Sequence, residues 1–138
     1  MASSSPTLVA REKAREAVES VHTARDMRVI TWAQINNTSV TGGRFAVGAQ
    51  PLLQPGADGL VNTADDPTTL EEEITPGPDS ILGTSDDVHV PLANLWRTIA
   101  ITDISGEPSL RQLRVTIRYQ VGTTTRTYVL TTYVSSFA

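Results

Sequence analysis

A chain of 138 residues is long enough for one domain with a single hydrophobic core, and the absence of cysteine excludes any disulfide framework. The formal net charge of −4 is unevenly spread, because nine acidic side chains and no lysine or arginine stand between Phe45 and Trp96. This acidic middle would repel a phosphate backbone, which argues against nucleic-acid binding, and no apolar run reaches the roughly 20 residues that cross a bilayer.

The first predicted element is a helix of about six turns from Thr7 to Val29. The segment is rich in alanine, arginine, glutamate and lysine, which have high helix propensity, and it contains neither glycine nor proline. Ser5 is the expected N-cap and Pro6 the first helical residue, and fraying at the far end sets residues 7–35 as the widest extent of the helix. Small apolar residues at spacings of three and four form a narrow stripe: Ala10, Ala14, Ala17, Val18, Val21 and Ala24. Because the stripe is mostly alanine, whatever covers it must lie close.

Residues 1–6 are expected to be a linker at the start of a soluble fragment. A natural chain rarely opens directly into a long helix, and the first five residues do not resemble a signal peptide. We therefore expect the natural N-terminus to lie upstream and the missing part to include any membrane-spanning segment.

Residues 36–91 are predicted to be a variable acidic loop, rich in proline, glycine, aspartate and threonine from Gln50 onward. From Gln50 to Pro91 the connection is about forty residues long, and it is expected to be disordered or held together by something other than an apolar core. One stretch is duplicated: PGADGLVNTADD, residues 55–66, recurs as PGPDSILGTSDD, residues 76–87, at a period of 21. The two copies flank three consecutive glutamates, residues 71–73.

The duplicated stretch is a candidate calcium site. Each copy groups three aspartates and a threonine around a glycine-containing turn, and calcium takes about six to eight oxygen ligands in flexible geometry. The candidate ligands are Asp58, Thr63, Asp65 and Asp66 in the first copy and Asp79, Thr84, Asp86 and Asp87 in the second. The spacing departs from the EF-hand pattern, and it leaves open whether there are two ions or one shared ion closed by a glutamate from residues 71–73. The alternative is a solvated loop whose aspartates only cap turns.

The last third of the chain is predicted to be an antiparallel meander. Its strands are Leu92 to Asp103, Arg111 to Val121 and Thr125 to Ser135, joined by turns at residues 105–108 and 122–124. The middle strand alternates almost without error, with an apolar face of Leu113, Val115, Ile117, Tyr119 and Val121. Leu95, Ile99 and Ile101 are the matching residues of the first strand, and Tyr128, Leu130 and Val134 those of the last.

The only large apolar stripe available to cover this sheet belongs to the N-terminal helix. The predicted fold is therefore α+β, with a long N-terminal helix packed on a C-terminal antiparallel sheet of three to four strands and a long acidic loop between them. The whole chain, residues 1–138, forms one domain, in which the sheet occupies residues 92–138.

Catalysis finds little support in the sequence. His22 and His89 have no nucleophile and orienting acid at motif spacing, and no glycine-rich phosphate loop is present. A glycosidase cleft needs aromatic walls, whereas aromatic residues make up 5% of the chain. We predict that the protein is not an enzyme.

Two segments of the sequence resemble parts of a known protein family. AREKAREAVESVHTARDMR, residues 10–28, looks like the exposed half of a pilin spine helix. LRQLRVTIRYQVGTTTRTYVLTTYVSS, residues 110–136, is similar to the closing hairpin of minor pseudopilins. With the order helix, loop, meander, the chain resembles type IV pilin-like proteins, in particular minor pilins and type II secretion pseudopilins, over residues 7–35 and 92–138.

The resemblance implies a precursor with a short basic leader, a prepilin peptidase cleavage and methylation site, and an apolar helix in the inner membrane. It also implies a periplasmic or extracellular filament whose subunits pack through their N-terminal helices, and some pseudopilins carry a calcium site in a loop beside the sheet. Arg114 and Arg118, on the polar face of the middle strand, would contact acidic patches of neighbouring subunits or serve solubility alone.

The expected function is therefore that of a non-catalytic filament subunit with a calcium-stabilised loop. A calcium-dependent adhesion or cell-surface binding module is the alternative, and a hydrolase that uses the acidic loop is a third hypothesis.

Overall fold

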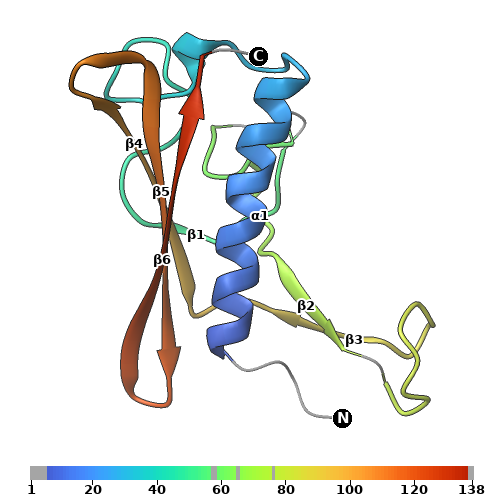
Figure 1. The fold of residues 1–138 in the computed structure, drawn as a ribbon. Helices are drawn as coiled ribbons and strands as arrows, with labels where there is room; N and C mark the ends of the chain where they lie inside the picture. Colours follow the sequence, from blue (N-terminus) through green and yellow to red (C-terminus); the bar gives the residue numbers. More distant parts are fainter. Residues whose placement is uncertain (1–5, 57–58, 65, 76, 137–138) are drawn as a thin grey trace.

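The computed structural model describes residues 6–56, 59–64, 66–75 and 77–136. Over these ranges the chain is α+β, with a helix packed on one face of an antiparallel sheet (Figure 1). The helix α1 is Pro6–Asp26, and the sheet has the strand order β1-β4-β5-β6, made of Gln50–Pro51, Leu95–Ile104, Glu107–Val121 and Thr124–Ser135. A second, two-stranded sheet pairs β2, Glu72–Thr75, with β3, Val88–Pro91, and a short 3-10 turn spans Trp32–Gln34. No helix in the described ranges is long and apolar enough to cross a membrane.

Helix α1 begins at Pro6, as predicted, but ends at Asp26 and so is shorter than the predicted segment. The expected N-cap, Ser5, lies outside the described residues. At the other end Arg28 adopts a left-handed backbone conformation, φ 58°, and the Val29 amide donates to the carbonyl of Ala24 at 2.8 Å. This is a Schellman cap, which usually places glycine where Arg28 stands, so composition alone gave no stop signal.

The alanine stripe of α1 packs across β5 and β6. The buried helix residues are Val9, Ala10, Ala14, Ala17, Val21 and Ala24, and Val18 is partly buried against the same core. Facing them from the sheet are the buried side chains Ile99, Ile101, Leu113, Val115, Ile117, Tyr119 and Val134. The predicted stripe and the predicted inner face of the sheet are confirmed, and the small alanine side chains let the two layers approach closely.

The meander follows the predicted order with shifted ends. Strand β5 begins at Glu107, four residues before the predicted start, because pairing with β4 continues up to a tight turn at Ser105 and Gly106. Strand β4 begins at Leu95, and Leu92, predicted as its first residue, is instead buried beside Val9 and Leu52.

The expectation that residues 50–91 are disordered or held together by something other than an apolar core is wrong. Leu52, Leu60 and Val61 are buried, and Leu60 and Val61 join the main core under α1, as does Phe45 just before this stretch. Isolated bridges tie Phe45 to residues 37 and 63, and β1 pairs with β4. A few apolar residues spaced between turns therefore fix this segment, although they form no run long enough for the sequence pattern to reveal.

Asn37 completes the β4 edge beyond β1. Its side-chain amide donates to the carbonyl of Ile99 at 2.7 Å and accepts from the amide of Ile101 at 2.9 Å. The side chain thus supplies the donor and acceptor that a neighbouring strand would provide. This contact holds the start of the 36–91 segment against the main sheet.

Candidate functional site

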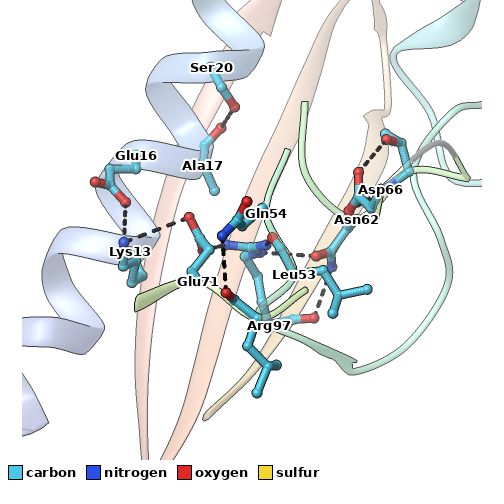
Figure 2. A network of polar contacts seen from close by, with 12 residues as sticks. Lys13, Glu16, Ala17, Ser20, Leu53, Gln54, Asn62, Asp66, Glu71 and Arg97 are labelled. Carbon is cyan, nitrogen blue, oxygen red and sulfur yellow. Dashed lines mark hydrogen bonds and ion pairs between the residues drawn. The ribbon is translucent and has the colours of Figure 1, made fainter. Parts of the chain in front are cut away.

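The segment 36–91 is organised around a buried arginine of β4. Arg97 is only 1% exposed and points to the same face as Ile117, toward α1. Its guanidinium donates to Asn62 Oδ1 at 2.9 Å, to Glu71 Oε2 at 3.0 Å and to the carbonyl of Leu53 at 3.3 Å (Figure 2). Leu53, Asn62 and Glu71, three separate parts of segment 36–91, therefore all contact one positively charged side chain.

Glu71 connects this arginine to the helix. Its second oxygen, Oε1, lies 3.7 Å from Lys13 Nζ, and Lys13 also pairs with Glu16 at 3.0 Å (Figure 2). The backbone of Glu71 is held as well, since its amide donates to Leu52 and its carbonyl accepts from Leu92. Glu71, one of the three glutamates that could close a shared calcium shell, is thus already engaged by two cations of the chain.

Arg97 and the role of Glu71 were missed in the sequence. The alternation of β4 places residue 97 on the inner face between Leu95 and Ile99, so an arginine there was a sign of a buried charge. It is also the first basic residue after the acidic segment. Nothing in the sequence indicated which of the nine acids would meet it.

The duplicated stretch is a structural repeat as well as a sequence repeat. Gly59 and Ser80, at equivalent positions, have φ of 73° and 58°, and Asn62 and Gly83 have φ of 58° and 87°. Equivalent turns are closed by the same backbone bonds, from residue 59 to 56 at 3.0 Å and from residue 80 to 77 at 2.8 Å. Asp66 and Asp87 each donate their amide to the threonine three residues earlier, at 3.2 Å in both copies.

In the second copy the three predicted carboxylates meet at one hydroxyl. Thr84 Oγ1 lies 2.8 Å from Asp79 Oδ2, 2.5 Å from Asp86 Oδ1 and 3.4 Å from Asp87 Oδ1. Since a hydroxyl donates only one hydrogen, it cannot satisfy all three carboxylates at once. The Thr84 hydroxyl, followed by the Asp79 amide, lowers the pKa of Asp86. The remaining oxygens accept from the amides of Asp79, Ile81 and Gly83.

In the first copy Asp58 and Asp65 lie outside the described residues. Asp66 Oδ1 accepts from the Thr63 hydroxyl at 2.9 Å, the same contact that Asp87 makes with Thr84. Burial raises the pKa of Asp66, and the hydrogen bonds from Thr63 oppose that shift. The two copies therefore share a conformation but differ in surroundings. The first copy packs beside Arg97 of the main sheet, whereas the second forms the end of the β2–β3 hairpin.

The structure does not bring all the candidate ligands together. The described candidate aspartates fall into two groups, Asp66 near Arg97 and the other three around Thr84. His89 pairs with Glu72, from Nδ1 to Oε2 at 3.0 Å, rather than with Asp86 or Asp87. In the described part of the chain no group of three or more histidine, cysteine, aspartate or glutamate side chains is arranged to hold a metal ion.

Fold and site together define an α+β domain in which a helix covers an antiparallel sheet and a duplicated acidic turn element lies beside it. Comparisons with protein-family models, curated proteins and solved structures find no match to this chain. What the protein does is therefore proposed from its own residues.

Proposed function

We propose that the chain is a non-catalytic structural subunit, a minor pilin or type II secretion pseudopilin, of a type IV pilus or type II secretion filament. The packing of α1 supports the proposal: its alanine stripe lies on the sheet, while exposed charged residues line its opposite side, among them Arg11, Glu12, Arg15 and Glu19. A pilin-like subunit needs such a helix, held rigidly to its domain and able to continue upstream into the filament core.

Under this proposal the full-length precursor is anchored in the inner membrane by an apolar segment that precedes α1. The domain described here faces the periplasm or forms the outer surface of the filament, and neighbouring subunits meet through their N-terminal helices. The sequence upstream of residue 6 is the decisive observation. An apolar run of about 20 residues there supports the filament role. A secretion signal or another folded domain in its place favours the calcium-dependent adhesion or cell-surface module.

The proposal includes calcium bound by the acidic repeats. The ligands would be Asp58, Thr63, Asp65 and Asp66 in one copy and Asp79, Thr84, Asp86 and Asp87 in the other. The shared backbone conformation of the copies and the three carboxylates that compete for the Thr84 hydroxyl support this assignment. The acidic segment offers no lysine or arginine between Phe45 and Trp96 to balance those charges, so a divalent cation would relieve their repulsion.

Thermal unfolding at increasing calcium concentrations tests whether the acidic repeats bind calcium. Calcium at about a hundred times its Kd should stabilise the folded state by about 2.7 kcal/mol relative to chelator, and magnesium should do less. Asp79→Asn should reduce this response, whereas Asp26→Asn, a matched change on α1, should leave it intact. If chelator changes neither the melting temperature nor the proteolysis of residues 50–91, the repeats are not a structural metal site.

Hydrolysis is tested separately. Turnover of a substrate that is abolished by Asp79→Asn while calcium affinity is retained would replace the structural role with an enzymatic one.

A further inference from the structure

The hairpin of β2, the second repeat and β3, residues 72–91, projects from the body and is called the acidic arm. It leaves on the side of the sheet that carries α1 and extends beyond the helix (Figure 1). Among the described strands, β2 and β3 pair only with each other. A two-stranded hairpin is marginally stable in water by itself, so this arm gains from any surface that covers it.

The arm carries a large share of the exposed apolar side chains of the described residues. Among the described residues, five of the twelve exposed large apolar side chains belong to it, each 41–60% exposed: Ile74, Ile81, Leu82, Val88 and Val90. Ile81 and Leu82 lie at the tip, within the turn that also carries Asp79, Asp86 and Asp87. The register places Ile74 on one face of the hairpin and Val88 and Val90 on the other. The tip therefore presents two adjacent exposed aliphatic side chains, Ile81 and Leu82, beside carboxylates, a combination found at contact surfaces.

The face of the main sheet opposite α1, called the outer face, combines arginines with exposed apolar side chains and so complements the acidic arm. Register places Arg114, Arg118, Val129 and Tyr133 on this outer face, and Arg118 lies over the ring of Trp96 at 4.6 Å. Val129 and Tyr133 are 43% and 54% exposed. The strand positions that alternate to this face between residues 96 and 133 include two arginines and no acid.

We propose that the acidic arm of one copy docks on the outer sheet face of a second copy. The aliphatic tip would cover Val129 and Tyr133, and the carboxylates would face Arg114 and Arg118. Bound calcium does not remove the attraction, because the three tip aspartates outnumber the two charges of one ion. Both halves of the contact belong to this chain and lie on opposite sides of it, which makes a second copy the fitting partner.

Such a contact is heterologous, since the arm and the outer face are different surfaces. Each copy that offers its arm still has a free outer face, so the contact repeats along an open assembly and does not stop at a dimer. The inference rests on the proposed function and adds to it the surface by which neighbouring domains would touch outside the helical core.

The cysteine-free sequence allows a direct test by disulfide trapping. Leu82→Cys in one preparation is mixed with Tyr133→Cys in another under mild oxidation, and the mixed dimer is quantified on a non-reducing gel. We expect its yield to exceed, on the order of tenfold, that of Leu82→Cys mixed with Val40→Cys, a similarly exposed residue outside the outer face. Adding Arg114→Glu and Arg118→Glu to the Tyr133→Cys partner should return the yield to the control level, whereas Arg126→Glu should not.

Sedimentation velocity of the unmodified chain gives a second, variant-free readout. We expect the mean sedimentation coefficient to rise with concentration past the dimer value and to fall with added salt, which screens the arginine contacts. Equal trapping of target and control pairs, dominant Leu82–Leu82 dimers, or trapping unaffected by charge reversal in variants with an unchanged melting temperature would each overturn the inference.

The two proposals fail in distinguishable ways. Trapping without an upstream apolar segment would keep the arm contact and remove the pilin role. An upstream segment without trapping would keep the pilin role and remove the arm contact.

Discussion

Arg97 carries a positive charge that is almost completely removed from water, and one carboxylate, Glu71, neutralises it. Asn62 and the Leu53 carbonyl add neutral acceptors. The burial of such a pair contributes little net stability, but the loss of one partner leaves the other charged and unpaired. The pair also connects residues that are 26 positions apart in sequence, so it fixes where the acidic segment meets the sheet.

Glu71→Gln should therefore lower the free energy of unfolding by about 2–4 kcal/mol, because the amide still accepts from Arg97 but no longer neutralises it. Urea denaturation measures this loss. Glu16→Gln removes an exposed partner of Lys13 and should cost less than about 1 kcal/mol. Adding Arg97→Met to Glu71→Gln should cost less than the two single changes together. Additive losses would show that the two side chains act independently.

Asp66 and Asp86 should affect the pH dependence of stability in opposite directions. The pKa of Asp66 is raised by burial, so its ionised form disfavours the fold and stability is regained as pH falls through that raised pKa. The pKa of Asp86 is lowered, chiefly by the Thr84 hydroxyl, so its ionised form stabilises the fold. This stabilisation is fully present above the ordinary aspartate pKa and is lost as pH falls through the lowered pKa.

With calcium removed by a chelator, Asp66→Asn should raise the melting temperature at neutral pH. This increase should become smaller as the pH falls toward the ordinary pKa of aspartate. Asp86→Asn should destabilise the protein at the same neutral pH. Melting temperatures from pH 7 down to about pH 4 compare the two variants with the parent. Parallel pH profiles for both variants would contradict the assigned causes.

At the scale of elements, two glycines illustrate the difference between the body and the arm. A Cβ added at Gly43 would lie 2.0 Å from the carbonyl oxygen of Asn37, and one added at Gly77 would lie 1.9 Å from that of Asp86. The clash is equally severe in both places. Gly43 sits in the segment that packs on the main sheet, whereas Gly77 closes the turn at the base of the second repeat.

Gly43→Ala should lower the free energy of global unfolding by at least about 2 kcal/mol, since the displaced backbone carries the Asn37 contacts to β4. Gly77→Ala should leave global unfolding nearly unchanged and increase proteolytic cleavage within residues 76–91, because the arm packs mainly on itself. The fluorescence of Trp32 and Trp96, both in the body, follows global unfolding in urea. A large shift of that transition in Gly77→Ala would mean that the arm is part of the cooperative core.

At the scale of the whole molecule, the architecture depends on one close interface between two layers. Alanines of α1 lie against β-branched residues and leucine of the sheet, so there is little room between helix and strands. Residues 36–71 lie along the β4 edge and are tied there by Asn37 and Asn62, while the acidic arm, residues 72–91, projects away.

Ala17→Leu should destabilise the fold by about 1–3 kcal/mol, because the larger side chain forces α1 away from the sheet. Glu19→Leu adds an apolar side chain to the exposed side of the same helix and should change stability by less than about 0.5 kcal/mol. Thermal or urea unfolding distinguishes them. Equal effects would place the tight contact elsewhere than at the alanine stripe.

The sequence by itself determined the helix, its alanine stripe, the three long strands and the equivalence of the two repeats. These features are local: a period of about 3.6 or 2 residues fixes a face, and turn residues fix a loop conformation, whatever the rest of the chain does. Only the tertiary structure decided that the acidic segment has buried residues of its own, that Arg97 takes Glu71 and Asn62 as partners, and that Asn37 completes the sheet edge. Those contacts join residues 26, 35 and 62 positions apart, and no periodicity extends over such distances. The acidic side chain that pairs with Arg97 is the one that tertiary packing places beside it. That packing arises only when the helix, the sheet and segment 36–91 come together.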